Sequence, residues 1–259
     1  MNIQAYLNRI NFFQTLKADK ITLFQLHQAH LYSIPFEDLN IHYNIPIILK
    51  EKNLYQKVIE GNRGGFCYEL NGLFNELLKA IGFQTTIISA KVINKEGITG
   101  PPFDHAALVV DLEKRWLVDV GYGGDSFVFP KELVLEKIQK DVHAYYKFTQ
   151  YNEKEWLLMH SEDGENFKGQ YIFSFEAQQL VNFKPECDRK QTQPDSHFMQ
   201  NFICTMATPN GRISIINDQF IVKENGGKQS RIVTNEAERL ILLAEQFYIP
   251  VDNLISKRE

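Results

Sequence analysis

Apolar residues between Gly65 and Gly82 recur three and four residues apart, which is the spacing of one face of a helix. They are Phe66, Leu70, Leu73, Phe74, Leu77, Leu78 and Ile81. The pattern predicts an amphipathic helix with one buried stripe, closed by Gly82 as its C-terminal cap. Cys67 falls in the first turn of this helix, so a cysteine opens the longest helix that the sequence predicts.

The chain before this helix also has helical patterning. Apolar positions recur at helical spacing over residues 6–16, 23–31 and 49–60, and Thr22 is a candidate cap for the second segment. Pro35 interrupts the pattern, because the residue before a proline is disfavoured in helical geometry. Residues 33–42 are therefore expected to form a loop that crosses the helices.

After Gly82 the periodicity changes from helical to alternating. Strands are predicted over residues 85–93, 105–112, 115–120, 144–151, 155–160 and 170–176. A connection rich in Gly and Pro covers residues 94–104, and a tight turn near Glu113-Lys114 joins the second and third strands into a hairpin. The middle of the chain is expected to form an antiparallel barrel or sandwich.

The last part of the chain combines short strands with a final helix. Strands are predicted over residues 203–208, 212–216, 219–223 and 231–234, and an amphipathic helix over 235–247. Residues 177–201 are polar and without period, which predicts an irregular linker. Helices, then strands, then a small α/β piece give an α+β fold rather than a parallel βαβ one.

Composition narrows the functional classes. The 259 residues carry a formal net charge of -4 and no basic block, which disfavours a nucleic-acid partner. No apolar run approaches the roughly 20 residues that span a bilayer, and no secretory signal pattern is expected at the N-terminus. The three cysteines have no CxxC spacing, so a disulfide framework and a zinc site are disfavoured.

Cys67 is a candidate catalytic nucleophile. The N-terminal end of a helix is electropositive, and Arg63 lies close by in sequence. Both features favour the thiolate, which is the nucleophilic form of cysteine. The alternative is a small buried apolar residue, the usual role of a free cysteine. The local sequence leaves both interpretations open.

A cysteine nucleophile needs a base within hydrogen-bond reach and a group that orients the base. His105 opens a predicted strand directly after the loop at residues 94–104, and Asp119 lies on the partner strand. If the turn between them has an odd length, Asp119 lies opposite Ala107 and shares a face with His105. With a two-residue turn, the two side chains point to opposite faces. A surface histidine and a charge-paired carboxylate are the structural alternatives.

Two further features have a structural and a functional interpretation. Gly121-Tyr122-Gly123-Gly124 permits close approach of a ligand, but it lacks the residues that complete a phosphate-binding loop, so a simple turn is the plainer interpretation. Glu37 and Arg63 either form a partly buried pair that fixes the cysteine loop or remain solvated. The histidines show no spacing typical of a metal site.

These motifs resemble those of the arylamine N-acetyltransferases. The most specific match is the string Arg63-Gly64-Gly65-Phe66-Cys67, followed by the His105 strand and Asp119-Val120-Gly121-Tyr122-Gly123. Residues 34–42 are similar to the family's N-terminal motif, and its later motifs resemble Pro194-Asp195-Ser196-His197-Phe198 and Thr208-Pro209-Asn210-Gly211. The match follows the family's order over most of the chain.

The resemblance implies an architecture and a reaction. It implies a helical bundle at residues 1–83, an antiparallel β-barrel at 84–176 and an α/β lid at 202–259, joined through the linker at 177–201, with a papain-like Cys-His-Asp core. In the implied ping-pong reaction, Cys67 takes an acetyl group from acetyl-CoA and passes it to an arylamine, arylhydrazine or arylhydroxylamine. His105 would then be the base and acid, and Asp119 the orienting carboxylate.

The resemblance also assigns binding residues. The aromatic acceptor pocket would be lined by Phe36, Val92 and Tyr122. The path of CoA would be lined by Phe103, Asp104, Gly123, Ser196 and Thr208. The family often has Phe at the position of Tyr122 and a small polar residue at that of Asp104. These two departures bear on acceptor preference and on the fit of CoA.

Three other functions compete with acetyl transfer. They are an amide synthase of the same fold acting on a polyketide thioester, a papain-like cysteine hydrolase, and a degenerate binding protein. Intact Cys67, His105 and Asp119 disfavour the last. The expected partners are CoA and a small aromatic amine or hydrazine, without metal, nucleic acid or membrane. A cytoplasmic monomer or weak homodimer is expected.

Overall fold

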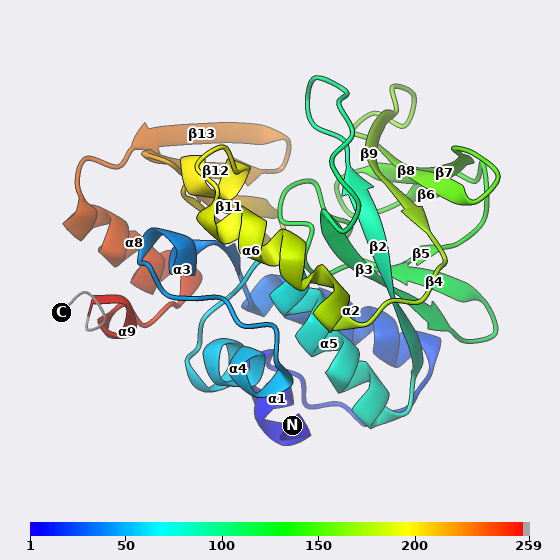
Figure 1. Cartoon of the computed structure of the whole chain (residues 1–259), viewed down its shortest axis with the longest axis horizontal. Helices are drawn as coiled ribbons and strands as arrows, with labels where there is room; N and C mark the ends of the chain where they lie inside the picture. The colour runs from blue at the N-terminus through cyan, green and yellow to red at the C-terminus, as the bar shows by residue number, and fades with distance from the viewer. Residues whose placement is uncertain (256–259) are drawn as a thin grey trace.

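The computed structural model describes residues 1–255 and places two antiparallel sheets side by side, with the N-terminal helices along one side of them (Figure 1). These helices are α1 (Ile3–Arg9), α2 (Lys20–Ser33), α3 (Leu39–His42), α4 (Glu51–Tyr55) and α5 (Cys67–Ile81). A π-helical turn, Gln56–Glu60, extends α4. The longest predicted helix is confirmed, because α5 begins at Cys67 and ends at Gly82, whose φ is 109°.

The larger sheet contains eight strands and makes the barrel. They are β2 (Gln84–Val92), β3 (His105–Asp111), β4 (Arg115–Val118), β5 (Lys131–Glu132), β6 (Gln139–Lys140), β7 (Tyr145–Gln150), β8 (Glu155–Ser161) and β9 (Lys168–Ser174). The spatial order is β5-β4-β3-β2-β9-β8-β7-β6, with every pairing antiparallel. Leu108 and Val110 pack with α5, whereas Ala107 and Val109 join a second core inside the barrel. The alternation along β3 therefore separates two cores.

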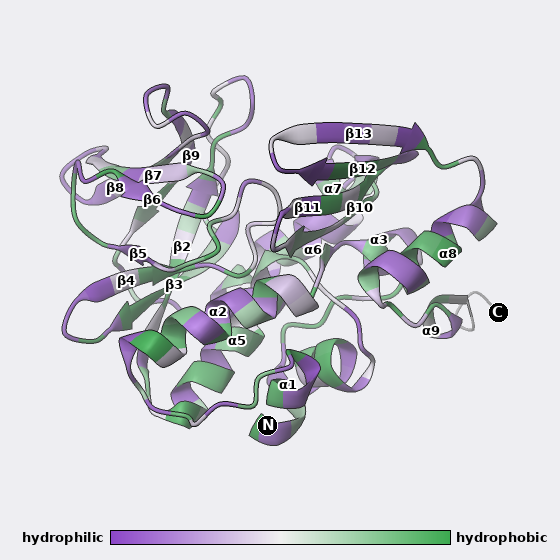
Figure 2. Cartoon of the chain, turned by 180° about the vertical axis from the view of Figure 1, so that it is seen from behind, coloured by the Kyte–Doolittle hydropathy of each residue, from purple (hydrophilic) through white to green (hydrophobic). Residues whose placement is uncertain are grey.

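The smaller sheet recruits a strand from the N-terminal part of the chain. Its order is β1 (Phe36–Glu37), β10 (Ile203–Thr208), β11 (Gly211–Ile216), β12 (Gln219–Glu224) and β13 (Gly227–Ile232). The amphipathic α8 (Glu236–Phe247), with green and purple segments in Figure 2, packs on this sheet, and α9 (Asp252–Ile255) follows. We call β10–β13 with α8 the lid. The segment predicted to cross the helices as a loop thus pairs with the lid through β1.

The stretch at residues 177–201 is helical, so the prediction of irregular structure there was wrong. It contains a 3₁₀ turn at Leu180–Phe183, α6 (Lys184–Thr192) and α7 (His197–Gln200). Helix α6 lacks the apolar stripe on which the sequence prediction relied. It is supported instead by an ion pair of Arg189 with Glu186 and by Pro185 in its first turn. The division into bundle, barrel, linker and lid stays a prediction, and residues 256–259 of the last range lie outside the described residues.

Two other helix boundaries differ from the expected ones. Helix α1 ends at Arg9, because the chain turns at Asn11 with a φ of 54°, and Phe13 is 76% exposed instead of continuing the stripe. Asp19 caps α2 in place of Thr22, since its carboxylate accepts a hydrogen bond from the Thr22 N–H at 2.9 Å. The first difference shortens the predicted apolar stripe, and the second concerns the cap alone.

Candidate active site

Cys67 is the first residue of α5 and is almost completely buried. The residue before it, Phe66, is extended, and the Glu69 carboxylate accepts a hydrogen bond from the Phe66 N–H at 3.1 Å. This bond satisfies one N–H at the helix start, where first-turn donors have no acceptor within the helix. The Cys67 N–H is another such donor, so it is suited to bind a ligand oxygen at the cysteine.

The chain reaches Cys67 through a close crossing of two backbones. Gly65 forms a parallel bridge with Phe36 of β1. A Cβ atom at Gly64 would lie 2.0 Å from the Pro35 carbonyl oxygen, a distance that no side chain can occupy. The glycines before the cysteine therefore let β1 pass directly under the nucleophile loop.

The hairpin of β3 and β4 brings His105 and Asp119 onto one face. Asp111 pairs with Arg115, so the turn has three residues, and Leu108 pairs with Val118. The odd-length turn that the hypothesis required is confirmed. His105 Nε2 donates to Asp119 Oδ2 at 2.7 Å, and both side chains are buried.

Asp119 is held by donors from several elements. In addition to the His105 ring, its carboxylate accepts hydrogen bonds from Asn71 Nδ2 at 2.9 Å, Tyr171 Oη at 3.0 Å and the Gly121 N–H at 3.0 Å. Burial alone would raise the pKa of the Asp119 carboxyl, but the charged His105 ring, helped by the bonds from Asn71 and the Gly121 N–H, keeps it below its ordinary value. The carboxylate therefore stays charged beside the imidazole.

Sequence reasoning missed Asn71, although a signal was present. Asn71 lies four residues after Cys67 and so shares its helix face. Its amide donates to the Ala106 carbonyl oxygen at 2.6 Å as well as to Asp119, and its oxygen accepts from the Val120 N–H at 2.9 Å. A single side chain thus fixes α5 to both strands of the hairpin.

His27 is a second residue that the sequence did not single out. Its Nδ1 donates to the Val128 carbonyl oxygen at 2.8 Å, and its Nε2 accepts from the Asp119 N–H at 3.2 Å. Burial lowers the pKa of His27 to about 4, so the ring is neutral at pH 7. It supports the backbone of Asp119 without adding charge.

The charge on His105 depends on its neighbours. Burial alone would lower the pKa of His105, but the Asp119 carboxylate outweighs it and, helped by the Cys67 side chain, raises the pKa to about 10. His105 is therefore an imidazolium at neutral pH. This ring is the cation that pairs with the Cys67 side chain.

We expect an NMR titration to find that the His105 ring loses its proton near pH 10 in the resting protein. Because this pKa lies above the ordinary value of 6.5, the stability that the charged ring contributes is complete below pH 6.5. It is lost as the pH rises to about 10. A titration midpoint near 6.5 would contradict the charged pair.

The predicted acceptor residues lie around the same centre. The ring of Tyr122 meets that of His105 edge-on, with centroids 5.6 Å apart. A Cβ at Gly123, whose φ is 86°, would lie 3.0 Å from the ring of Phe36. Val92 of β2 pairs with Tyr171 of β9, the residue whose hydroxyl donates to Asp119. Phe36 therefore lies against the glycine loop that follows Asp119 and contains Tyr122.

The residues predicted to line the path of CoA differ in their hydrogen-bond partners. Asp104 accepts from Lys190 Nζ at 2.5 Å and from the Val92 N–H at 3.2 Å, and Ser196 donates to the Lys190 carbonyl oxygen at 2.7 Å. Asp104 thus ties α6 to the loop before β3, and Ser196 satisfies a carbonyl oxygen within α6. Thr208 differs, because its buried Oγ1 has no hydrogen-bond partner among residues 1–255.

Phe103 and Gly123 complete the set proposed for CoA, and both have a positive φ, 63° and 86°. The Phe103 N–H donates to Ser89 Oγ at 2.9 Å, and its carbonyl oxygen accepts from Tyr68 Oη at 2.7 Å. The backbone next to His105 is therefore fixed from both sides.

Comparisons with known proteins agree with this site. A family model described as N-acetyltransferase matches residues 20–255. An arylamine N-acetyltransferase / N-hydroxyarylamine O-acetyltransferase of Salmonella typhimurium is 30% identical over 256 residues, which cover 97% of this chain and 90% of that protein. The chain belongs to the arylamine N-acetyltransferase family.

Other members are similar at the levels of sequence and structure. Arylamine N-acetyltransferase 1 of Homo sapiens is 31% identical over 232 residues, covering 82% of this chain and 79% of that protein. An N-arylamine acetyltransferase variant of Mycobacterium smegmatis superposes with a TM-score of 0.92 at 27% identity, covering 99% of this chain and 96% of that one. The predicted α+β fold with its papain-like core is confirmed.

In this family member, Arg63 binds an acidic and an amide side chain. Its Nη2 donates to Glu37 Oε1 at 2.9 Å and to Asn40 Oδ1 at 3.1 Å, so the predicted pair with Glu37 is confirmed. Lys57 adds a second cation, with its Nζ 2.8 Å from a Glu69 oxygen and 3.5 Å from Glu37. The contacts of Arg63 therefore give it a structural role, and its expected effect on the Cys67 thiolate stays a prediction.

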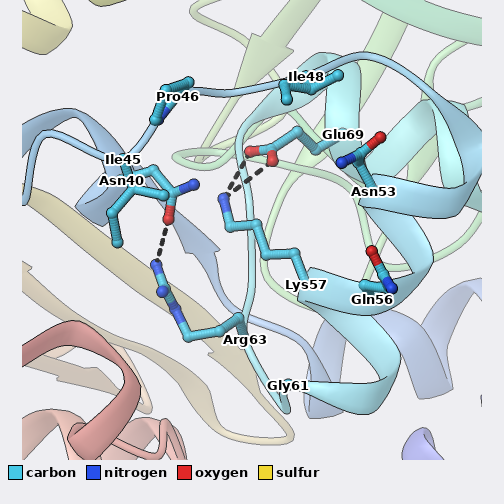
Figure 3. A pocket seen from close by; sticks show the side chains of 10 residues that line it. All are labelled: Asn40, Ile45, Pro46, Ile48, Asn53, Gln56, Lys57, Gly61, Arg63 and Glu69. Carbon is cyan, nitrogen blue, oxygen red and sulfur yellow. Dashed lines mark hydrogen bonds and ion pairs between the residues drawn. The ribbon is translucent and has the colours of Figure 1, made fainter. Parts of the chain in front are cut away.

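A pocket of about 320 Å³ lies over this ionic network. Figure 3 shows Lys57 reaching Glu69 and Arg63 reaching Asn40 at its wall. None of Cys67, His105 and Asp119 lines this pocket. Its polar wall consists of the groups that hold the cysteine loop, so it is separate from the catalytic centre.

Within residues 1–255, no group of three or more His, Cys, Asp or Glu side chains is placed to hold a metal ion. No helix of that same range is long and apolar enough to span a membrane.

Proposed function

We propose that the protein transfers an acetyl group from acetyl-CoA to an arylamine through a thioester on Cys67. The observation that carries this proposal is the buried Cys67–His105–Asp119 arrangement, in which His105 is charged and Asp119 is saturated with donors. Membership of the arylamine N-acetyltransferase family supports it.

In the first half-reaction, the Cys67 sulfur attacks the acetyl carbonyl carbon of acetyl-CoA. The carbonyl oxygen becomes an oxyanion, which the free N–H at the start of α5 can stabilise. When the C–S bond to CoA breaks, the imidazolium of His105 gives its proton to the departing thiolate. The products are acetyl-Cys67, neutral His105 and CoA.

In the second half-reaction, the amine nitrogen attacks the thioester carbon. Neutral His105 accepts the proton that the nitrogen loses, and the Cys67 thiolate departs. This step restores the Cys67 thiolate and the His105 imidazolium. Asp119 keeps the ring in the tautomer that places its other nitrogen, Nδ1, on the side away from the carboxylate. One acid and base therefore serves both halves of the reaction.

The binding residues are part of the proposal. Phe36, Val92 and Tyr122 would contact the aromatic acceptor. The unpartnered hydroxyl of Thr208 suits a polar group of CoA, because a buried donor without a partner is costly unless a ligand satisfies it. Phe103, Asp104, Gly123 and Ser196 would shape the entry of CoA, with Asp104 and Ser196 acting through Lys190.

The test is an intact mass measured after incubation with acetyl-CoA and no acceptor. We expect the protein to gain one acetyl group, and to lose it on addition of an arylamine. Cys67→Ala should gain none. Cys187→Ala, which removes another buried free thiol, should behave as wild type. Rapid release of acetate without an acceptor would favour a cysteine hydrolase, and no adduct at all would refute acetyl transfer from CoA.

A further inference from the structure

The pocket over the ionic network is a cavity of about 320 Å³ between α4, the segment that follows α3 and the loop before α5. Ile45, Pro46 and Ile48 give one part of its wall an apolar surface. Between them, Ile47 is buried, and its N–H donates to Gln191 Oε1 of α6 at 2.9 Å. The apolar wall is therefore held in place from outside, so the pocket is formed before any ligand binds.

The polar part of the wall has more N–H donors than acceptors. Within residues 1–255, the hydrogen bonds of the Arg63 guanidinium involve Nη2 alone, and its buried Nε has no partner. The Asn40 side chain accepts from Arg63 through its oxygen, while its amide nitrogen donates to no group of that range (Figure 3). The side-chain amides of Asn53 and Gln56 also form no hydrogen bond with the described part of the chain.

The acidic side chain in this wall, Glu69, is already neutralised. Its two oxygens accept from Lys57 Nζ at 2.9 and 2.8 Å, and one of them also accepts from the Phe66 N–H at 3.1 Å. The unused donors of Arg63 and Asn40 therefore favour a ligand that supplies oxygen acceptors. A carboxylate fits best, because the planar guanidinium donates to it through parallel N–H groups.

We propose that this pocket binds a small organic acid, whose carboxylate contacts Arg63 and Asn40 and whose apolar part lies against Ile45, Pro46 and Ile48. The site is distinct from the proposed CoA and acceptor sites, because none of the residues assigned to those sites lines it. The inference therefore goes beyond acetyl transfer and does not depend on it.

Such a ligand would join the segments that hold Cys67. Asn40 lies in α3, shortly after β1, and Arg63 lies in the loop before α5. Asn53 and Gln56 lie in α4 and in the π-helical turn that extends it. Because these segments come together only in the folded protein, the ligand binds the folded state and stabilises it. The organic acid is thus an effector that strengthens the crossing of β1 under the cysteine loop.

The experiment uses hexanoate as the probe and NMR of isoleucine methyl groups as the readout. We expect hexanoate to shift the methyl signals of Ile45 and Ile48 saturably, with a Kd of about 20 mM or tighter, the weakest value expected for a ligand of its size. Ile213, which packs in the lid, should not respond. Uncharged hexanamide should bind at least about 10-fold more weakly, because it makes no charge-assisted pair with the guanidinium.

Asn53→Phe fills the pocket without removing a side-chain hydrogen bond, and Lys52→Phe is the matched control. Lys52 is an exposed neighbour on α4 that does not line the pocket. The affinity for hexanoate should fall at least about 10-fold in Asn53→Phe. It should change less than about 3-fold in Lys52→Phe. Hexanoate should also raise the Tm of the wild type and of Lys52→Phe, but not that of Asn53→Phe.

Gln56→Phe, in the adjacent exposed turn, repeats the test with a second filling side chain. The proposal is overturned if the signals of Ile45 and Ile48 do not shift, or if hexanamide binds as tightly as hexanoate. It is also overturned if both filling variants keep the wild-type affinity, since the probe would then bind elsewhere. These outcomes are independent of acetyl transfer, because no arm of the experiment measures it.

Discussion

Replacing Asp119 with Asn is expected to slow acetylation of Cys67 by about ten-thousand-fold, the loss seen when the orienting carboxylate of a catalytic triad becomes an amide. The amide cannot balance the charge of the imidazolium. Burial, which already opposes the charge on His105, would then dominate and make the ring neutral. An amide can also donate to Nε2, which would favour the wrong tautomer.

Two measurements check this prediction. The rate of acetyl adduct formation gives the loss directly, and an NMR titration of His105 should show that its pKa falls from about 10 to below 6.5. Asp111→Asn is the matched control, because Asp111 is an exposed residue of the same hairpin, paired with Arg115. The role of Asp119 would be refuted by near-normal acetylation in a folded Asp119→Asn protein.

The sequence predicted those parts of the site that depend on local pattern. The apolar stripe of α5 and its glycine cap fixed the position of Cys67 at a helix start. Period-two alternation fixed the faces of the hairpin, so the geometry of His105 and Asp119 reduced to one question, the length of a turn. Local pattern could not answer that question, because turns of two and three residues both fit Leu112-Glu113-Lys114.

What the sequence did not reveal depends on contacts between distant segments. His27 and Tyr171 reach Asp119 from α2 and β9, which lie 92 and 52 residues away in the chain. Nothing in their local patterns distinguishes them from core residues. The contacts of Arg63 were left open for a related reason: closeness to Cys67 in sequence suggested a direct charge effect, and only the fold shows that the guanidinium binds Glu37.

Helix α6 illustrates a different limit of the sequence prediction. A short polar helix on the surface has no apolar periodicity to detect, and its stability comes from pairs such as Glu186 with Arg189 and from contacts of Lys190 with Asp104. Strand β1 also has too little local pattern to be predicted, because it has two residues and forms only where β10 provides its partner.

The second large effect concerns stability. We expect Arg63→Met to lower the free energy of unfolding by about 3–5 kcal/mol, the cost of removing one partner of a buried ion pair. Glu37 is completely buried, and Arg63 and Lys57 together hold its pKa below the ordinary value against the effect of burial. Without Arg63, the carboxylate retains the Leu39 N–H at 2.8 Å and a single cation, Lys57 at 3.5 Å, which also serves Glu69. Urea-induced unfolding measures the change.

Two further variants separate this buried pair from an ordinary surface one. Arg189→Met removes a more exposed partner of Glu186 and should cost about 0–1 kcal/mol. Adding Glu37→Gln to Arg63→Met should recover part of the loss, because the stranded charge is then removed. A cost for Arg63→Met no larger than that for Arg189→Met would show that the network is unimportant for stability. The expected large cost would mean that Arg63, next to Gly64 and Gly65, stabilises the crossing of β1 under the cysteine loop. Arg63 would then support catalysis by holding Cys67 in position.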